Sequence, residues 1–239
     1  MSHIPWLDSN QLAFPPLERA LKSPNGLLAA GGDLSPERLK VAYSEGIFPW
    51  YESGQPILWW SPDPRSVLFP AKLHISRSLR KTLRKNLFNV TADTAFESVI
   101  NACAKSRKYT HGTWITPEMQ RAYTQLFQLG YAHSVEAWQN GELVGGLYGV
   151  ALGRAFFGES MFSFRTDASK VAFVHLVKQL QIQGYQVVDC QVSSEHLFSL
   201  GAEEIPRSQF SQILLDCVDI ETEYCKDIDF KITWRYDNE

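Results

Sequence analysis

The pattern of apolar and polar positions becomes regular after Pro70 and predicts a series of helices and strands. Apolar residues recur there either at helical spacing or in strand-like alternation. We expect helices over residues 77–86, 94–106, 116–130, 168–183, 195–200 and 208–218, and strands over residues 132–138, 142–150, 154–158, 185–191 and 204–206.

Capping and turn signals support several of these elements. Ser76 and Thr116 are suitable N-cap residues for the helices that follow them. Asn140-Gly141 lies between two alternating runs, which is the strongest short-range signal for a β-hairpin. A meander followed by a helix and another strand indicates a parallel pair within an otherwise antiparallel sheet. The fold class predicted is therefore α+β with a mixed, mostly antiparallel sheet.

The first 66 residues have a different character, rich in turns and aromatic residues. Ser35 caps one short helix that ends near Gly46. Prolines in the segments 48–51 and 59–65 are expected to exclude regular structure there. We therefore predict a small irregular N-terminal domain over residues 1–66 and a larger domain over residues 67–239.

The composition indicates a globular protein without a membrane segment. Hydrophobic residues make up 44% and charged residues 21% of the 239 residues, which is close to the globular average. The sequence contains no apolar run of about 18 residues and begins without a secretory signal pattern. The four cysteines form no C-x-x-C pair and are expected to be reduced thiols. These features predict a cytoplasmic protein that does not associate with membranes.

Charge is distributed unevenly along the chain. The formal net charge of −3 argues, taken alone, against a nucleic-acid partner. Residues 216–239, however, contain eight acids and three bases, which leaves 20 bases against 18 acids in the rest of the chain. Residues 65–92 contain seven bases and no acid. The acidic balance is therefore largely a property of the C-terminal tail.

Five of those bases fall on one face of the helix predicted over residues 77–86. Leucines at 79, 83 and 87 are spaced so that they can pack inward from another face. A stripe of like charges lowers helix stability unless an anion lies opposite, and a phosphate backbone is such an anion. A solvated surface face is the alternative explanation. The stripe, here called the basic stripe, consists of Arg77, Arg80, Lys81, Arg84 and Lys85.

Aromatic residues are unusually dense in the N-terminal segment. Tryptophans in proline-rich loops can stack on nucleobases, and Trp50 and Trp114 are the better candidates for this role. For most of the others, a place in the core of a small domain is the simpler explanation. The set in the N-terminal segment is Tyr43, Phe48, Trp50, Tyr51, Trp59 and Trp60.

Two polar signals interrupt the predicted strands of the larger domain. Glu159 follows a strand and could present a carboxylate to a cleft, or could simply be an exposed acid. Asp189 and Gln191 should face the same side of an otherwise apolar strand, where polar groups need hydrogen-bond partners. They could form a cleft pair or anchor a loop. The sequence contains no nucleophile elbow, P-loop or metal-binding motif, and we predict no metal and no cofactor.

Several blocks of sequence together resemble the bacterial leucyl/phenylalanyl-tRNA–protein transferase family. The blocks occur in family order over nearly the whole chain, and each is short while the combination is highly specific. They are Gly26–Leu34, Gly46–Trp50, Trp59–Arg65, His74–Leu79, Gly112–Thr116, Gly158–Ser163 and Asp189–Gln191.

The resemblance implies an aminoacyltransferase with an acetyltransferase-like (GNAT) larger domain. Such an enzyme transfers leucine or phenylalanine, and also methionine, from charged tRNA to the N-terminal Lys or Arg of acceptor proteins. The new peptide bond creates an N-end-rule degradation signal. The glycine-rich pyrophosphate loop of a coenzyme A user is missing, which favours a tRNA ester as the donor.

The resemblance also implies roles for particular residues. Trp50 and Trp114 would hold the terminal adenine, with Tyr43 and Tyr123 close by. Asp189 and Gln191 would form the catalytic pair, and Glu159 would bind the cationic acceptor. The basic stripe would hold the tRNA acceptor stem. Ser163 would belong to the polar centre, and the aminoacyl pocket would be lined by Leu147, Met161, Phe173, Leu176 and Val188.

The reaction implied is aminolysis of an ester that is already activated, so the enzyme mainly aligns its substrates. We hypothesise that Asp189 orients and polarises Gln191, which contacts the attacking amine. Two other classes stay open on the sequence alone. An acetyl-CoA-dependent N-acetyltransferase fits the fold but lacks its pyrophosphate loop. A non-catalytic RNA-binding module fits the basic stripe and the aromatics but does not explain the polar strand pair.

Overall fold

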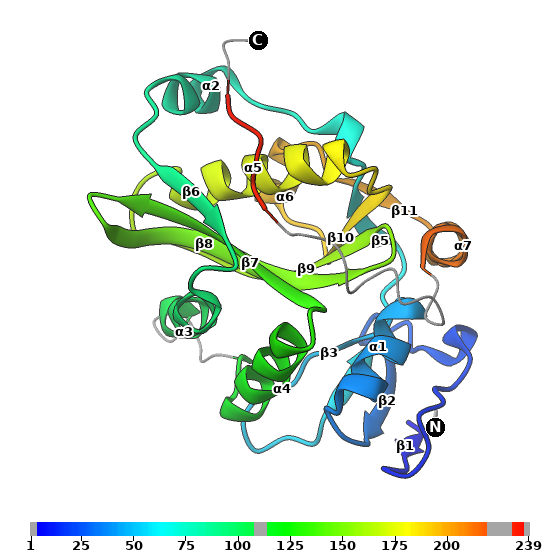
Figure 1. The fold of residues 1–239 in the computed structure, drawn as a ribbon. Coiled ribbons are helices and arrows are strands. Elements are labelled where there is room, and N and C mark those ends of the chain that lie inside the picture. The colour runs from blue at the N-terminus through cyan, green and yellow to red at the C-terminus, as the bar shows by residue number, and fades with distance from the viewer. Residues whose placement is uncertain (1–3, 108–113, 219–230, 237–239) are drawn as a thin grey trace.

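Two β-sheets and seven α-helices make up the described part of the chain (Figure 1). The structure is a computed structural model, and it describes residues 4–107, 114–218 and 231–236. Gly112 and Thr113 of the Gly112–Thr116 block, Cys225 and most of the acidic tail therefore lie outside the described residues. No helix in the described ranges combines the length and the apolar character that crossing a membrane requires.

The N-terminal region forms a small sheet, which the sequence did not predict. Its strands lie in the order β1-β2-β4-β3 and are packed with helix α1. The expectation that prolines exclude regular structure here was wrong, because Pro49 lies in an edge strand, where a missing N–H is tolerated. The elements are β1 (Trp6–Leu7), η1 (Leu17–Arg19), β2 (Leu27–Gly31), α1 (Pro36–Ser44), β3 (Phe48–Pro49) and β4 (Leu58–Trp60).

The larger sheet has seven strands in the order β11-β5-β10-β9-β8-β7-β6. Every neighbouring pair is antiparallel except β9 and β10. The predicted α+β class and the mixed, mostly antiparallel sheet are confirmed. Its strands are β5 (Arg65–Leu68), β6 (Asn89–Ala92), β7 (Ala132–Gln139), β8 (Glu142–Leu152), β9 (Ala155–Ser163), β10 (Val187–Gln191) and β11 (Glu203–Ile205).

Helices cover both faces of this sheet. Helix α5 lies on one face, and α3 and α4 lie on the other together with the small sheet (Figure 1). The helical elements are η2 (Pro70–Lys72), α2 (Arg77–Arg84), α3 (Phe96–Arg107), α4 (Pro117–Gln128), α5 (Ala168–Ile182), α6 (Glu195–Ser199) and α7 (Arg207–Cys217).

The local signals in the sequence correspond closely to what forms. Ser76 caps α2 by accepting from the Leu79 N–H at 3.3 Å, and Thr116 caps α4 in the same way. Asn140 and Gly141 both adopt the positive φ that a tight hairpin requires. The strand predicted over residues 154–158 is longer than expected. It continues as β9 through Glu159 to Ser163, because β8 pairs with it over that length.

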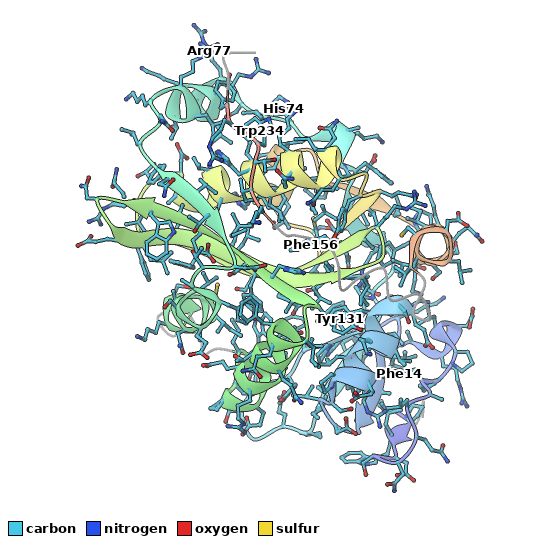
Figure 2. All side chains as sticks on the ribbon, in the orientation of Figure 1. Phe14, His74, Arg77, Tyr131, Phe156 and Trp234 are labelled. Carbon is cyan, nitrogen blue, oxygen red and sulfur yellow. The ribbon has the colours of Figure 1, made fainter. Side chains whose placement is uncertain are left out.

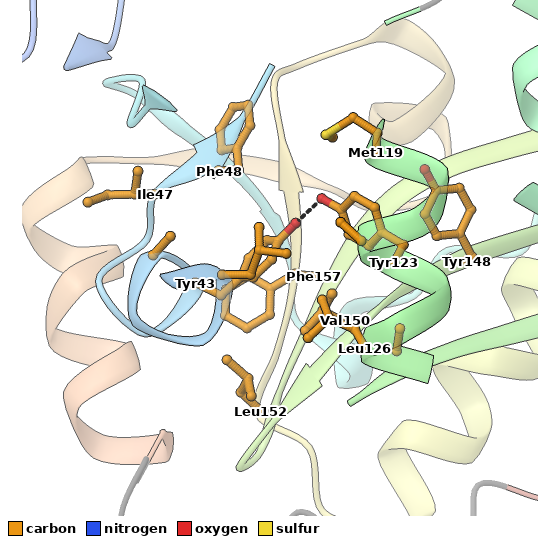
Figure 3. Close-up of a cluster of buried hydrophobic side chains, with 14 of the residues drawn as sticks. Tyr43, Ile47, Phe48, Met119, Tyr123, Leu126, Tyr148, Val150, Leu152 and Phe157 are labelled. Carbon is orange, nitrogen blue, oxygen red and sulfur yellow. Dashed lines mark hydrogen bonds between the residues drawn. The ribbon is translucent and has the colours of Figure 1, made fainter. Parts of the chain in front are cut away.

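Two buried apolar clusters lie on the two faces of the larger sheet. One joins α5 and α2 to the sheet, and Phe156 belongs to it. The other contains Phe157 together with Tyr43 from α1 and Tyr123 from α4 (Figure 3). The N-terminal region and the larger sheet therefore share a core. The division after residue 66 stays a prediction.

Candidate active site

The candidate site is a cavity of about 320 Å3 at the place where β9 and β10 separate. The parallel ladder pairs Val187–Asp189 with Ala155–Phe157 and then stops. The residues beyond it on both strands line the cavity, and α5 and the loops at Trp50 and Trp114 complete its wall. A parallel pair that opens in this way leaves backbone and side chains free to face a ligand.

Most of the site residues predicted from the sequence meet in this cavity. Tyr43 and Tyr123 are not part of its wall, and they lie behind Glu159. Ser163 is also absent from the wall. Its hydroxyl donates to the Arg165 carbonyl at 2.7 Å and accepts from the Ser169 N–H at 3.2 Å, which anchors the start of α5. The predicted residues that line the cavity are Trp50, Trp114, Leu147, Glu159, Met161, Phe173, Leu176, Val188, Asp189 and Gln191.

One part of the wall is apolar and suits an aliphatic or aromatic group. Leu147 comes from β8, Met161 from β9 and Val188 from β10, while α5 contributes Phe173 and Leu176. All except Met161 are buried. Removing an apolar side chain from water into such a wall is favourable, and the wall offers that side chain no charged partner.

Two tryptophans stand at the same cavity. Trp50 follows β3 and is 42% exposed, and Trp114 is half-buried just before α4. Trp60 holds the first of them, because its indole N–H donates to the Trp50 carbonyl at 2.7 Å and the two rings lie 5.6 Å apart. Tyr43, Phe48, Tyr51 and Trp59 are buried instead, which agrees with the core explanation for most of the aromatic set.

Glu159 is the centre of a buried polar network. The Tyr43 hydroxyl and the Gln191 amide donate to its Oε1 at 2.7 and 2.9 Å, and the Tyr123 hydroxyl donates to its Oε2 at 2.8 Å. The two tyrosine hydroxyls also contact each other, as Figure 3 shows. Each tyrosine has one hydroxyl proton, so while both donate to Glu159 neither can donate to the other. A proton on Glu159 lets the carboxyl donate to one tyrosine, whose own proton is then free for the contact between the two hydroxyls.

The electrostatics of the network agree with its geometry. Burial raises the pKa of Glu159 to about 7, and the nearby charge of Asp189 adds to the rise, while the hydrogen bonds from Tyr43, Tyr123 and Gln191 oppose it. Burial and the charge of Glu159 raise the pKa values of Tyr43 and Tyr123 well above the usual value. Glu159 therefore changes charge near neutral pH, whereas the tyrosines stay protonated.

Asp189 is held by a buried ion pair that the sequence analysis missed. Arg65 Nε donates to its Oδ1 at 2.8 Å and Arg65 Nη2 to its Oδ2 at 2.6 Å, with both side chains fully buried. Gln191 contacts Asp189 only through its backbone, which donates to Oδ1 at 2.9 Å. As predicted, both side chains face the same side and line the cavity, although the β10–β5 ladder is irregular here and Gln191 has a left-handed φ of 62°. Asp189 therefore orients Gln191 through the main chain. The side-chain amide of Gln191 donates to Glu159 instead.

A signal for Arg65 was present in the sequence. It begins an apolar strand, and Asp189 is the acid of another apolar strand, so each needs a partner of opposite charge when buried. The lining residues Phe48, Phe156 and His196 carried no comparable signal.

The basic stripe lies on α2, apart from the cavity. All five of its cations are exposed, while Leu79 and Leu83 are buried toward the sheet. The expectation that Leu87 packs inward was wrong, because it lies beyond the last turn of α2 and is 48% exposed. Thr82 fastens α2 to the loop before α5 by donating to Asp167 at 2.9 Å. Figure 2 shows the side chains at this end of the molecule, around Arg77.

The fold is therefore a meander, a helix and a strand that pairs in parallel with β9, with a cavity of mixed apolar and polar lining at the point where that pairing stops. In the described ranges, no three His, Cys, Asp or Glu side chains are placed to hold a metal. The family profile described as "Leucyl/phenylalanyl-tRNA protein transferase" matches residues 67–215, and that of its N-terminal domain matches residues 32–63. The chain belongs to the leucyl/phenylalanyl-tRNA–protein transferase family, as the resemblance predicted.

Individual relatives agree with this assignment. The chain is 61% identical over 214 residues to the leucyl/phenylalanyl-tRNA–protein transferase of Azotobacter vinelandii, covering 90% of this chain and 95% of the relative. It is 66% identical over 201 residues to that of Nitrosomonas europaea, covering 84% of this chain and 85% of the relative.

Solved structures with a similar arrangement are distant. L-PGS from Bacillus licheniformis has a TM-score of 0.40 at 10% identity, covering 67% of this chain and 52% of that protein. A GCN5-related N-acetyltransferase from Kribbella flavida has a TM-score of 0.36 at 13% identity, covering 71% and 60%. Likenesses of this degree carry no functional argument.

The burial of Glu159 leads to a prediction about stability and pH. Its pKa rises from 4.5 to about 7 on folding, so the folded state binds the proton more tightly. The resulting stabilisation is complete below about pH 4.5 and is lost as the pH rises through 7. Glu159→Gln does not titrate. We therefore expect wild type to lose on the order of 3 kcal/mol of unfolding free energy relative to this variant between pH 4.5 and 8.

Urea unfolding at several pH values measures this difference. Glu97→Gln, an exposed substitution on α3, serves as the control and should follow wild type across the range. A gap between wild type and Glu159→Gln that does not change with pH would contradict the buried, proton-binding Glu159.

Proposed function

We propose that the chain transfers leucine or phenylalanine, and also methionine, from charged tRNA to the N-terminal Lys or Arg of acceptor proteins. The product carries a new peptide bond and an N-end-rule degradation signal. The observation that carries the proposal is the cavity, where an apolar wall, two tryptophans and a buried polar centre meet. The reaction is cytoplasmic, because charged tRNA is its donor.

The cavity accommodates the two parts of an aminoacyl-adenosine separately. The apolar wall of Leu147, Met161, Phe173, Leu176 and Val188 receives the leucyl or phenylalanyl side chain. Trp50 and Trp114 receive the terminal adenine, since a base stacked on an aromatic ring is stabilised by roughly 1–3 kcal/mol. Tyr43 and Tyr123 act from behind the wall by holding Glu159.

The polar centre receives the acceptor. A free α-amino group has a pKa of about 7.7–8.0, so a sizeable neutral fraction is present at pH 7 and can attack the ester carbonyl. Gln191 contacts this amine, and Asp189 orients Gln191. Glu159 complements the cationic N-terminal residue of the acceptor when it is ionised. The enzyme mainly contributes alignment, because the ester is already reactive.

The basic stripe supplies affinity for the rest of the tRNA. Its five exposed cations extend along α2, outside the cavity, where phosphates of the acceptor stem can be neutralised without affecting the chemistry. Binding of this kind releases counterions, so it weakens steeply as salt rises. Affinity and chemistry therefore reside on different elements, joined through α5.

Transfer of labelled leucine from leucyl-tRNA to two reporter peptides tests the proposed function. We expect transfer to a peptide that begins with Arg and little or none to an otherwise identical peptide that begins with Ala. Peptide-bound label is measured after the remaining ester has been hydrolysed. No transfer to either peptide would refute the function, and equal transfer to both would refute the preference for a basic acceptor.

The role of the basic stripe is tested by salt dependence. Arg80→Gln with Arg84→Gln removes two phosphate contacts, so the slope of log affinity against log salt should decrease by about 2. Filter binding of charged tRNA at several salt concentrations measures the slope. Arg19→Gln with Lys105→Gln removes two exposed cations on η1 and α3 and should leave it unchanged. Equal slopes for wild type and the α2 variant would assign the stripe to a solvated surface.

A further inference from the structure

Arg65 is a fully buried cation that does not line the cavity, yet it holds a residue that does. Two of its nitrogens donate to the two oxygens of Asp189, at 2.8 and 2.6 Å. The pair joins β5 to the neighbouring strand β10 and is separated by 124 residues of sequence. A bidentate pair of this kind fixes orientation as well as distance, because the guanidinium fork matches a carboxylate.

The guanidinium group is also packed between other parts of the fold. Its Cζ lies 4.8 Å from the ring centroids of both Phe48, on β3, and Phe210, on α7. Its Nη1 is buried without a hydrogen-bond partner among the described residues. Asp189 is therefore the acidic partner that compensates this cation, and the two rings hold it in place. Phe48 itself lines the cavity two residues before Trp50.

The Arg65–Asp189 pair also positions the backbone of Gln191. Asp189 Oδ1 accepts the Gln191 backbone N–H at 2.9 Å, and Gln191 has a left-handed φ of 62°, an uncommon conformation for a residue with a side chain. In that conformation the Gln191 amide donates to Glu159 at 2.9 Å. Asp189 Oδ1 is the side-chain acceptor of this N–H, so removing it should loosen the direction of the Gln191 side-chain amide.

Both carboxylate oxygens of Asp189 already accept hydrogen bonds from the protein. The charged or titratable groups that face it are Arg65 from β5, Glu159 from β9 and Cys190 on its own strand. Oδ1 accepts from Arg65 and from the Gln191 backbone, and Oδ2 accepts from Arg65. Asp189 is fully buried beneath these donors.

We propose that Arg65 is a positioning residue for aminoacyl transfer, and that the Arg65–Asp189 pair aims Gln191 at the acceptor amine as one unit. Asp189 then serves as an anchor and takes no proton from the substrate. The proposal rests on the proposed function, since it assigns Gln191 the contact with the amine.

A double-mutant cycle tests the proposal. Asp189→Asn leaves the buried Arg65 charge uncompensated, and Arg65→Met does the same to Asp189. Each single variant should lower kcat at least 30-fold while KM for charged tRNA changes less than threefold. The double variant replaces the pair by neutral groups, and its Asn side chain still offers an oxygen to the Gln191 N–H. It should recover at least tenfold in kcat over Asp189→Asn.

Folding is controlled in two ways. Near-ultraviolet circular dichroism and charged-tRNA binding identify the folded fraction, to which kcat is normalised. Arg65→Lys, which keeps the charge and loses the fork, covers the case in which Arg65→Met does not fold, and it should also lower kcat at unchanged KM. The exposed pair Lys72–Glu203 supplies the matched control. Lys72→Met with Glu203→Gln, on η2 and β11, should leave kcat unchanged.

The outcomes separate the two proposals. Wild type that transfers no leucine in this assay would overturn the proposed function itself. If wild type transfers and the double variant loses the product of the two single losses, the two residues act independently and the positioning unit is refuted. Wild-type kcat in folded Arg65→Lys would refute it as well.

Discussion

The parallel pairing of β9 with β10 stops at Asp189, and the buried carboxyl groups of Glu159 and Asp189 at that point have partners from elsewhere in the chain. Buried polar groups are destabilising unless they are hydrogen-bonded. Tyr43 and Tyr123 supply donors for Glu159, and Arg65 supplies them for Asp189. These partners come from α1, α4 and β5, which lie far apart in sequence. The small N-terminal sheet and its helix therefore contribute to the site, since Trp50 lines the cavity and Tyr43 holds Glu159 from behind its wall.

The proposed reaction needs one site for the aminoacyl-adenosine and another for the tRNA phosphates, and the two lie on different elements. In the proposed reaction, the apolar wall and the tryptophans receive the aminoacyl-adenosine, whereas the basic stripe on α2 receives the phosphates of the tRNA. The carboxylates that would repel tRNA are buried at the cavity, each compensated by hydrogen bonds or an ion pair. A net charge of −3 is compatible with the proposed tRNA partner, because five exposed cations are gathered on one helix face.

The fold was predictable from the sequence where it depends on neighbouring residues. The caps at Ser76 and Thr116 and the turn at Asn140-Gly141 are local, and each formed as expected. The site was predictable in its residues and less so in its contacts. The pairing of Arg65 with Asp189 spans 124 residues, and Asp189 in turn accepts the backbone N–H of Gln191, whose φ is left-handed. The small sheet escaped prediction because three of its four strands have only two or three residues and carry no periodicity.

The central claim is that one cavity holds both the aminoacyl group and the adenine. A crystal structure of the protein with a non-hydrolysable leucyl-adenosine, its ester replaced by an amide, tests this most directly. The account predicts the leucyl side chain against Met161, Phe173 and Leu176, and the adenine in contact with Trp50 and Trp114. Density for the nucleoside at the second cavity, between Leu34, Tyr51 and Arg121, would contradict it. An empty cavity under saturating ligand would contradict it equally.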